Sequence, residues 1–199
     1  MRLATIELLK AAYHHCAVGA FNVCNLEQIH GAFRGASQAR APILVQFTRV
    51  IRSYAHPAMI EYLLQAAEEI YPDVVFAVHL DHGDEAACGD AIASGHYSSV
   101  MIDASHLPFD QNVETTRRVV ERAHARGVAV EAELGQLKGI EDAMSEDVKE
   151  AILTDPPKAA EFVERTGCDT LAVAIGTSHG AYKFSGTQRL HLDRLAEIQ

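Results

Sequence analysis

Short apolar runs rich in β-branched residues recur along the chain, and each is followed by a longer stretch with helical periodicity. This alternation is typical of βαβ units, in which parallel strands are joined by helices that cover the sheet. Six strands are predicted: Val18 to Val23, Pro42 to Phe47, Val74 to Leu80, Ser99 to Asp103, Val128 to Leu134 and Thr170 to Ile175. The pattern therefore restricts the chain to an α/β fold with a parallel sheet.

The helical stretches carry their own start signals. Asn25 is a suitable N-cap for Leu26 to Ala39, and Pro57 falls in the first turn of His56 to Ile70. Further helices are expected at Leu3 to Tyr13, after Asp155 and at Leu192 to Ile198.

Strict alternation fits either an open doubly wound sheet or a closed barrel. A dinucleotide-binding doubly wound fold would have a G-x-G-x-x-G segment after its first strand. The residues there are Ala20-Phe21-Asn22-Val23-Cys24-Asn25. The barrel is therefore the favoured architecture.

Charge and cysteine usage exclude several classes of protein. A net charge of -10, from 27 acidic and 17 basic residues, argues against a nucleic-acid partner. The four cysteines form no C-x-x-C pair, so neither a thiolate zinc site nor a disulfide framework is indicated. Glu7 and Lys10 interrupt the first apolar stretch, and no run is long enough to span a membrane. We therefore expect a cytoplasmic protein without a membrane partner.

Polar residues collect at the ends of the predicted strands, where barrel enzymes place their active sites. Any single one is explained equally well as a helix cap or a solvated loop residue. Their repetition at six successive strand ends favours a catalytic face. They are Asn22, Asn25, Gln46, Thr48, His79, Asp81, His82, Asp103, Ser105, His106, Glu131, Glu133, Thr177, Ser178 and His179.

Some of these residues are of types that bind metal. His82 and His179 stand at the ends of different strands near acidic residues, and zinc accepts imidazole and carboxylate ligands in catalytic sites. A histidine at a strand end is more often structural, so the residues alone leave both interpretations open. Glu131 and Glu133 share a face of their strand and would repel each other without a cation. The polar segment Gly135 to Asp142 is expected to be a mobile loop that carries Glu141 toward a substrate.

Several blocks, in order along the chain, resemble those of the zinc-dependent class II fructose-bisphosphate aldolases. They are A-F-N-V-x-N from Ala20 to Asn25, H-L-D-H-G from His79 to Gly83, V-M-I-D-A-S from Val100 to Ser105, V-E-A-E-L-G from Val130 to Gly135 and L-A-V-A-I-G-T-S-H-G-A-Y-K-F from Leu171 to Phe184. The resemblance spans nearly the whole chain. It implies a TIM (β/α)₈ barrel and a metal-dependent aldehyde-lyase.

The resemblance also implies roles for individual residues. Asp81 would handle the proton of the C4 hydroxyl, and Glu141 would exchange the C3 proton of dihydroxyacetone phosphate. Catalytic Zn²⁺ would be bound by His82 and His179, with Asp103 and Glu133 at a second or displaced metal position. A second divalent or a monovalent cation is an additional option. The substrate would contact Gly180, Asn25 and Thr48.

The implied reaction is the reversible cleavage of fructose 1,6-bisphosphate to dihydroxyacetone phosphate and glyceraldehyde 3-phosphate, in glycolysis and gluconeogenesis. Tagatose 1,6-bisphosphate is a close alternative that the sequence does not separate. The partners would be this sugar bisphosphate, the triose phosphates and further copies of the chain in a homo-oligomer.

The chain stops at Gln199, and the resemblance places the family's third zinc histidine and its phosphate loop beyond that point. Barrels of this kind usually need roughly 250 residues. Residues 1–199 are therefore expected to form a single, incomplete TIM-barrel domain, truncated after about six βα units. A catalytically inactive truncated domain is the alternative from a different functional class.

Overall fold

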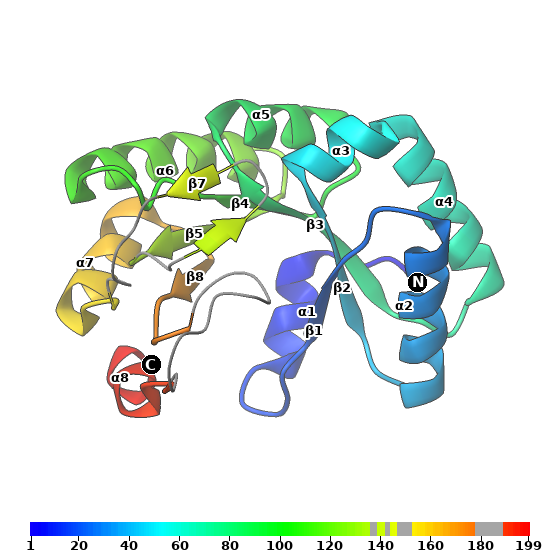
Figure 1. The fold of residues 1–199 in the computed structure, drawn as a ribbon, viewed down its shortest axis with the longest axis horizontal. Helices are drawn as coiled ribbons and strands as arrows, with labels where there is room; N and C mark the ends of the chain where they lie inside the picture. The colour runs from blue at the N-terminus through cyan, green and yellow to red at the C-terminus, as the bar shows by residue number, and fades with distance from the viewer. Residues whose placement is uncertain (136–138, 142–143, 147–152, 178–188) are drawn as a thin grey trace.

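The computed structural model describes residues 1–135, 139–141, 144–146, 153–177 and 189–199. Within them, six parallel strands form one sheet in the order β1-β2-β3-β4-β5-β8. The strands are β1 (Gly19–Asn22), β2 (Ile43–Thr48), β3 (Phe76–Gly83), β4 (Ser99–Ile102), β5 (Ala129–Leu134) and β8 (Thr170–Val173). All six predicted strands are confirmed, and the sheet curls into part of a barrel with helices around it (Figure 1).

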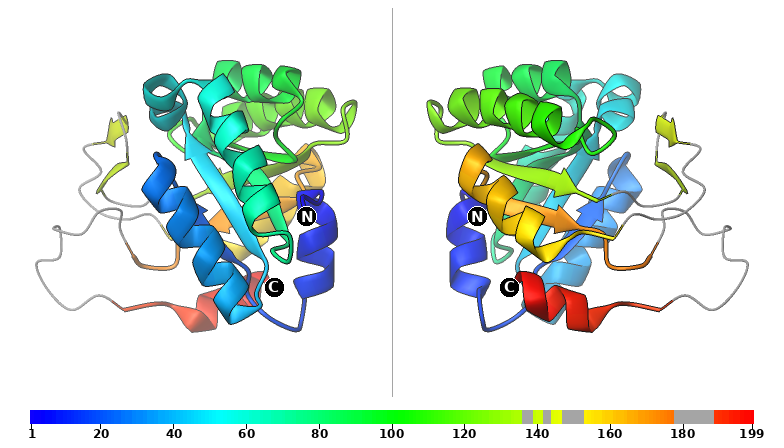
Figure 2. Two further views of the ribbon diagram at one scale, coloured as in Figure 1. Left: turned by 90° about the vertical axis from the view of Figure 1, so that its right-hand side faces the viewer. Right: turned by 90° about the vertical axis from the view of Figure 1, so that its left-hand side faces the viewer.

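Most helices run along the outer, convex side of the sheet (Figure 1). These are α2 (Leu26–Ala39), α3 (Arg49–Ala55), α4 (Pro57–Ile70), α5 (Glu85–Ser94), α6 (Phe109–His124) and α7 (Pro156–Thr166), while α8 (Leu192–Ile198) packs against α7. In contrast, α1 (Thr5–Ala12) lies where the strands begin, at the opposite end of the sheet from β6 (Gly139–Glu141) and β7 (Met144–Glu146) (Figure 2).

The predicted helix starts are confirmed by their hydrogen bonds. Oδ1 of Asn25 accepts from the backbone N–H of Gln28 at 2.9 Å, and Oδ1 of Asp155 accepts from that of Lys158 at 3.0 Å. Helix α3 and strands β6 and β7 were not predicted. The seven-residue helix α3 is too short to show periodicity. Strand β6 lies within the expected loop Gly135 to Asp142, and its antiparallel partner β7 lies just after it, with three residues in each strand.

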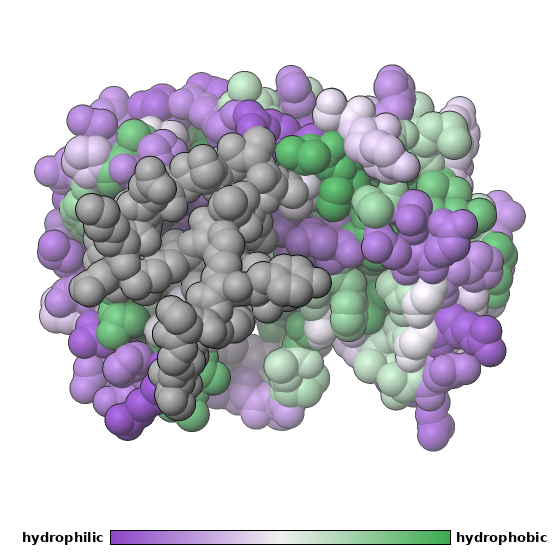
Figure 3. Space-filling model, viewed as in Figure 1, coloured by the Kyte–Doolittle hydropathy of each residue, from purple (hydrophilic) through white to green (hydrophobic). Residues whose placement is uncertain are grey.

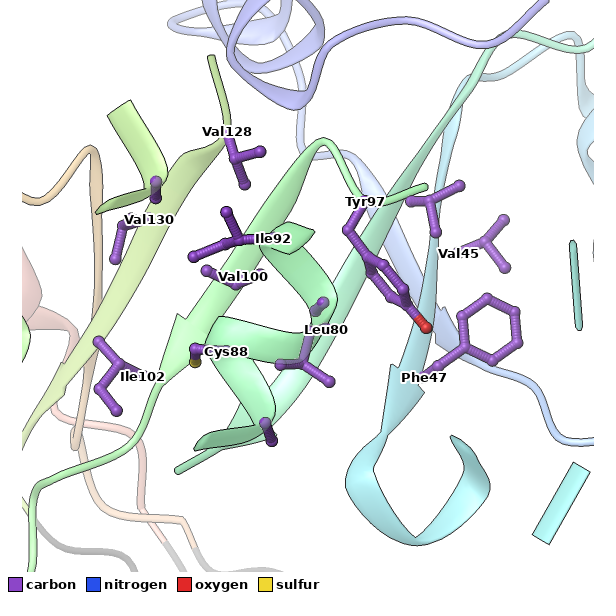
Figure 4. Packing of buried hydrophobic residues seen from close by; sticks show 14 of the residues in the cluster. Val45, Phe47, Leu80, Cys88, Ile92, Tyr97, Val100, Ile102, Val128 and Val130 are labelled. Carbon is purple, nitrogen blue, oxygen red and sulfur yellow. The ribbon is translucent and has the colours of Figure 1, made fainter. Parts of the chain in front are cut away.

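The main core lies between the convex face of the sheet and the outer helices. Alternate strand positions send apolar side chains outward, where they pack with Cys88 and Ile92 of α5 and with the nearby Tyr97 (Figure 4). Burial of each large side chain contributes about 1.5–3 kcal/mol. The outward set on the central strands includes Val45, Phe47, Val78, Leu80, Val100, Ile102 and Val130. The remaining positions of the same strands are therefore available for polar residues on the inner face.

A small second cluster closes the inner face near the strand starts. Leu8 of α1 packs there against Leu44 of β2 and Ala77 of β3. Later inner-face positions on these strands carry polar residues, so the chemistry is confined to the other end. Among the described residues, no helix combines the length and apolar character needed to cross a membrane.

Candidate metal centre

The ends of β3, β4 and β5 bring four titratable side chains together. Nδ1 of His82 lies 2.9 Å from Oδ2 of Asp103 and 3.9 Å from Oε2 of Glu133. Its Nε2 lies 4.0 Å from Oδ1 of Asp81. The four side chains are only 8 to 15% exposed, so solvent screens their charges weakly. Figure 3 shows hydrophilic residues near the centre of the view, where Figure 1 labels β3.

A bulge in β3 allows both Asp81 and His82 to face the cluster. Consecutive residues of a regular strand point to opposite faces. Here β3 passes through one more residue than β4 between two ladder pairs, Leu80 with Val100 and Gly83 with Ile102. His82 has a φ of 43°, in the left-handed region that side chains rarely adopt. The extra residue re-aims the imidazole, as bulges commonly do beside active sites.

Asp103 is held through both carboxylate oxygens. Oδ2 accepts from Nδ1 of His82, and Oδ1 accepts from the hydroxyl and the backbone N–H of Ser105 at 2.7 and 3.1 Å. Burial would raise the pKa of Asp103, but the hydrogen bonds from His82 and Ser105 outweigh it and hold the pKa below its usual value. The side chain is therefore ionised at neutral pH, which is the form that binds a cation.

Asp81 is oriented from the neighbouring part of the sheet. Nδ2 of Asn22, the last residue of β1, donates to Oδ2 of Asp81 at 2.7 Å. A hydrogen bond to the ionised carboxylate is of the stronger, charge-assisted kind. Asn22 thus fixes the direction in which Asp81 presents its second oxygen toward His82.

Glu131 and His79 lie next to the cluster, toward the strand starts. Burial, with a smaller contribution from the charge of Asp81, raises the pKa of Glu131 to about 7. Burial, with repulsion from His82, lowers the pKa of His79 to about 3. His79 is consequently neutral at pH 7, and the 3.5 Å approach between its Nε2 and Oε2 of Glu131 is not an ion pair. Nδ1 of His79 instead lies 2.7 Å from the hydroxyl of Ser99.

Two of the residues predicted to bind substrate, Asn25 and Thr48, cap helices in the structure. Asn25 caps α2, and Thr48 caps α3 by accepting from the backbone N–H of Ile51 at 3.2 Å. Both side chains therefore have a structural task, and their contact with substrate stays a prediction. Glu141 ends β6, while His179 and Gly180 lie outside the described residues.

The donor set fits a transition-metal ion of the zinc type. Ligand atoms of His82, Asp103 and Glu133 all lie within 4.8 Å of one another. One imidazole and two carboxylates are N and O donors of the kind that zinc accepts. The carboxylates of the half-buried Asp103 and the buried Glu133 would repel each other at this distance without a cation between them.

The sequence did not single out Asn112, whose side chain contacts the backbone of Glu133. Asn112 of α6 is 1% exposed, and its Nδ2 donates to the backbone carbonyl of Glu133 at 3.0 Å. The sequence does hold one indication of this position. Asn112, Thr116 and Val120 follow one another at intervals of four residues, which places them on the same, buried face of α6. An amide on such a face needs a hydrogen-bonding partner, here found at the end of β5.

Comparison with known proteins identifies relatives along the whole chain. The family model for class-II fructose-bisphosphate aldolase matches residues 4–199. The fructose-bisphosphate aldolase of Giardia intestinalis is 48% identical over 203 residues, covering 100% of this chain and 62% of that protein. The enzyme of the same name from Helicobacter pylori is 44% identical over 193 residues, covering 96% of this chain and 62% of that protein. The chain thus spans less than two thirds of the length of these curated relatives.

Solved structures agree with this match. A protein of Coccidioides immitis described as a fructose-1,6-bisphosphate aldolase superposes with a TM-score of 0.87 at 34% identity, covering 98% of this chain and 68% of that one. The YdjI aldolase of Escherichia coli K12 gives a TM-score of 0.80 at 30% identity, covering 100% of this chain and 68% of that one. Together with the family model, these similarities confirm what the sequence blocks predicted: the chain belongs to the class II fructose-bisphosphate aldolase family.

Proposed function

We propose that the protein is a zinc-dependent aldehyde-lyase that cleaves fructose 1,6-bisphosphate reversibly to dihydroxyacetone phosphate and glyceraldehyde 3-phosphate, a step of glycolysis and gluconeogenesis. The observation that carries the proposal is the cluster of His82, Asp103 and Glu133 beside Asp81. The names of the Giardia and Helicobacter relatives favour fructose over tagatose bisphosphate as the substrate. Because the chain spans 62% of their length, the reaction is proposed from the part of the site that its own residues form.

Asp81 is proposed as the catalytic acid/base. In the cleavage direction it accepts the proton of the C4 hydroxyl while the C3–C4 bond breaks and C4 becomes an aldehyde. The electron pair of that bond passes to an enediolate of the triose phosphate. Asn22, which donates to Oδ2 of Asp81, keeps the carboxylate aimed during this transfer. Glu141 then delivers the proton to C3 that completes dihydroxyacetone phosphate.

The metal ligands are proposed to be His82 and His179, with Asp103 and Glu133 at a second or displaced metal position. Zn²⁺ bound by these residues would supply Lewis-acid chemistry for the cleavage. We also propose that the site can bind a second divalent or a monovalent cation. The hydrogen bond from His82 and the two from Ser105 hold the Asp103 carboxylate ready for the cation.

Substrate contacts are proposed for Gly180, Asn25 and Thr48. Thr48 uses an acceptor site of its hydroxyl oxygen to cap α3, and its O–H proton can still donate to a substrate oxygen. We also propose that residues 1–199 fold as a single domain, that the protein forms a homo-oligomer and that it acts in the cytoplasm. Light scattering of the purified protein measures the oligomeric state directly.

The proposed reaction is tested by coupling triose phosphate release to a dehydrogenase, with fructose 1,6-bisphosphate and tagatose 1,6-bisphosphate as substrates. We expect cleavage of the fructose substrate, loss of activity with a chelator and recovery when Zn²⁺ is added back. Borohydride with dihydroxyacetone phosphate should not inactivate the protein, since no lysine Schiff base is required. Cleavage that persists in the chelator would reject the metal mechanism, and stoichiometric zinc binding without cleavage would reject the activity of this chain.

A further inference from the structure

We infer that three buried side chains outside the metal centre, Asn112, Thr116 and Thr154, position Glu133 for metal binding by holding the end of β5. The inference rests on the proposed function, because it takes Glu133 as a metal ligand. None of the three side chains is among the ligands or catalytic groups proposed above. Each is 0 to 1% exposed, so its hydrogen bonds are shielded from water.

The backbone of β5 reaches beyond its neighbour β4 at the site. The pairing between these strands runs from Ser99 with Ala129 to Ile102 with Ala132. Glu133 is the next residue on β5, and Asn112 supplies the donor for its carbonyl through Nδ2 at 3.0 Å. A buried carbonyl needs such a partner. The amide of Asn112 thus continues the hydrogen bonding of the sheet by one position, at the residue that carries the carboxylate.

Thr116 determines which way this amide faces. Its hydroxyl, one helical turn further along α6, donates to Oδ1 of Asn112 at 3.1 Å. An asparagine side chain has one acceptor atom and one donor group, so a donor placed at Oδ1 leaves Nδ2 for the carbonyl. Thr116 and Asn112 therefore form a directed chain of two hydrogen bonds that ends on Glu133.

Thr154 holds the other edge of the same strand. Its hydroxyl donates to the carbonyl of Leu134, the last residue of β5, and accepts from the backbone N–H of Ala174 at 2.8 Å. Its own N–H donates to the carbonyl of Ala174 at 3.0 Å. The pairing of β5 with β8 ends at Leu134 with Val173, so Thr154 bridges the two strands just beyond their last pair.

The two sets of contacts act on consecutive residues. Glu133 is held from the side of α6, and Leu134 is held from the side of β8. Oε2 of Glu133 lies 3.9 Å from Nδ1 of His82, a distance that a small shift of the strand end would change. Groups that orient metal ligands through such hydrogen bonds commonly change metal affinity by about 10- to 100-fold when removed.

The test is the zinc dissociation constant, measured by competition with a chromophoric chelator. Thr116→Val and Thr154→Val keep the side-chain shape and remove the hydroxyl. We expect each to weaken zinc binding about tenfold or more. Thr154→Ser, which restores the hydroxyl, should return the affinity to within about twofold of the parent.

Thr166→Val is the matched control. Thr166 lies at the end of α7, is 3% exposed, donates to the carbonyl of Phe162 at 2.8 Å and accepts from the N–H of Cys168 at 3.3 Å. It therefore loses the same two kinds of hydrogen bond as Thr154→Val, at a site away from β5. Zinc affinity within about twofold of the parent for all three valine variants would overturn the inference alone. A parent protein that binds no zinc would overturn the metal site and the inference together.

Discussion

Nδ1 of His82 donates to Oδ2 of Asp103 across 2.9 Å, joining residues 21 positions apart at the ends of neighbouring strands. The contact depends on the bulge in β3, because regular alternation would point the side chain of His82 away from the inner face. It also depends on Ser105, which holds the other oxygen of Asp103. Strand irregularity and loop hydrogen bonding are therefore both needed to assemble the proposed metal centre.

Asp103→Asn is expected to weaken zinc binding about tenfold or more, because the amide has no negative charge for the cation. The chelator competition assay measures this change. Asp90→Asn is the control, since Asp90 is an exposed carboxylate on α5 away from the cluster. Unchanged zinc affinity in Asp103→Asn would remove Asp103 from the metal centre.

Asp81→Asn should lower kcat for cleavage by several orders of magnitude while zinc remains bound. The amide keeps the shape of the carboxylate but cannot accept the C4 hydroxyl proton. Steady-state kinetics and metal analysis of the same preparation check both parts. A variant that keeps near-parent kcat would show that another group handles the proton.

Gly83, directly after His82, should not tolerate a side chain. A Cβ at this position would lie 2.7 Å from Cδ2 of Leu80 and 2.9 Å from Sγ of Cys88. We expect Gly83→Ala to lower the free energy of unfolding by about 1–3 kcal/mol. Gly89 on α5 has no described atom within 4 Å of such a Cβ, so Gly89→Ala should raise it by about 0.5–1 kcal/mol. Urea unfolding curves compare the two, and equal effects would contradict the packing around Gly83.

Acid should destabilise the fold through His79. Its folded-state pKa of about 3 lies below the ordinary value of 6.5, so the unfolded chain binds the proton first as pH falls. The stability that depends on neutral His79 is therefore full above pH 6.5 and is lost progressively toward pH 3. Between pH 7 and pH 5 the loss due to His79 alone is about 2 kcal/mol, whereas Glu131, whose folded-state pKa is raised to about 7, contributes a gain of about the same size.

Urea unfolding at the two pH values isolates the His79 contribution as the difference between the parent and His79→Gln, which lacks the titrating group and should change by about 2 kcal/mol in the stabilising direction relative to the parent on going from pH 7 to pH 5. His15→Gln, at an exposed histidine, serves as the control. The same pH dependence in all three proteins would mean that His79 titrates normally in the folded state.

Much of the fold was predictable because its signals are local. The six strand runs, the N-caps Asn25 and Asp155 and the boundaries of α2 and α8 all follow from hydrophobic period and capping chemistry within a few residues. The grouping of Asp81, Asp103 and Glu133 was also predictable, because parallel strands end at a common edge.

The remaining features depend on contacts between distant residues. The left-handed backbone of His82 is stabilised within a bulge whose partner strand begins 17 residues later, at Ser99, and no local pattern marks it. The donation from Asn22 to Asp81 and that from Asn112 to Glu133 likewise require the assembled sheet. In the sequence, both asparagines are simply polar residues near strand ends or helix starts.

The bulge of β3 also makes this strand unusually sensitive to changes in chain length. Between two of its pairs with β4, strand β3 has one residue more than β4. A one-residue deletion between Leu80 and Gly83 would therefore restore simple alternation. Such a deletion removes Asp81 or His82, the two residues in between, and leaves one side chain on the inner face where the bulge now supplies two. Insertions and deletions at these positions should therefore abolish metal binding even where the sheet still forms, whereas substitutions that keep the residue count can leave the geometry intact.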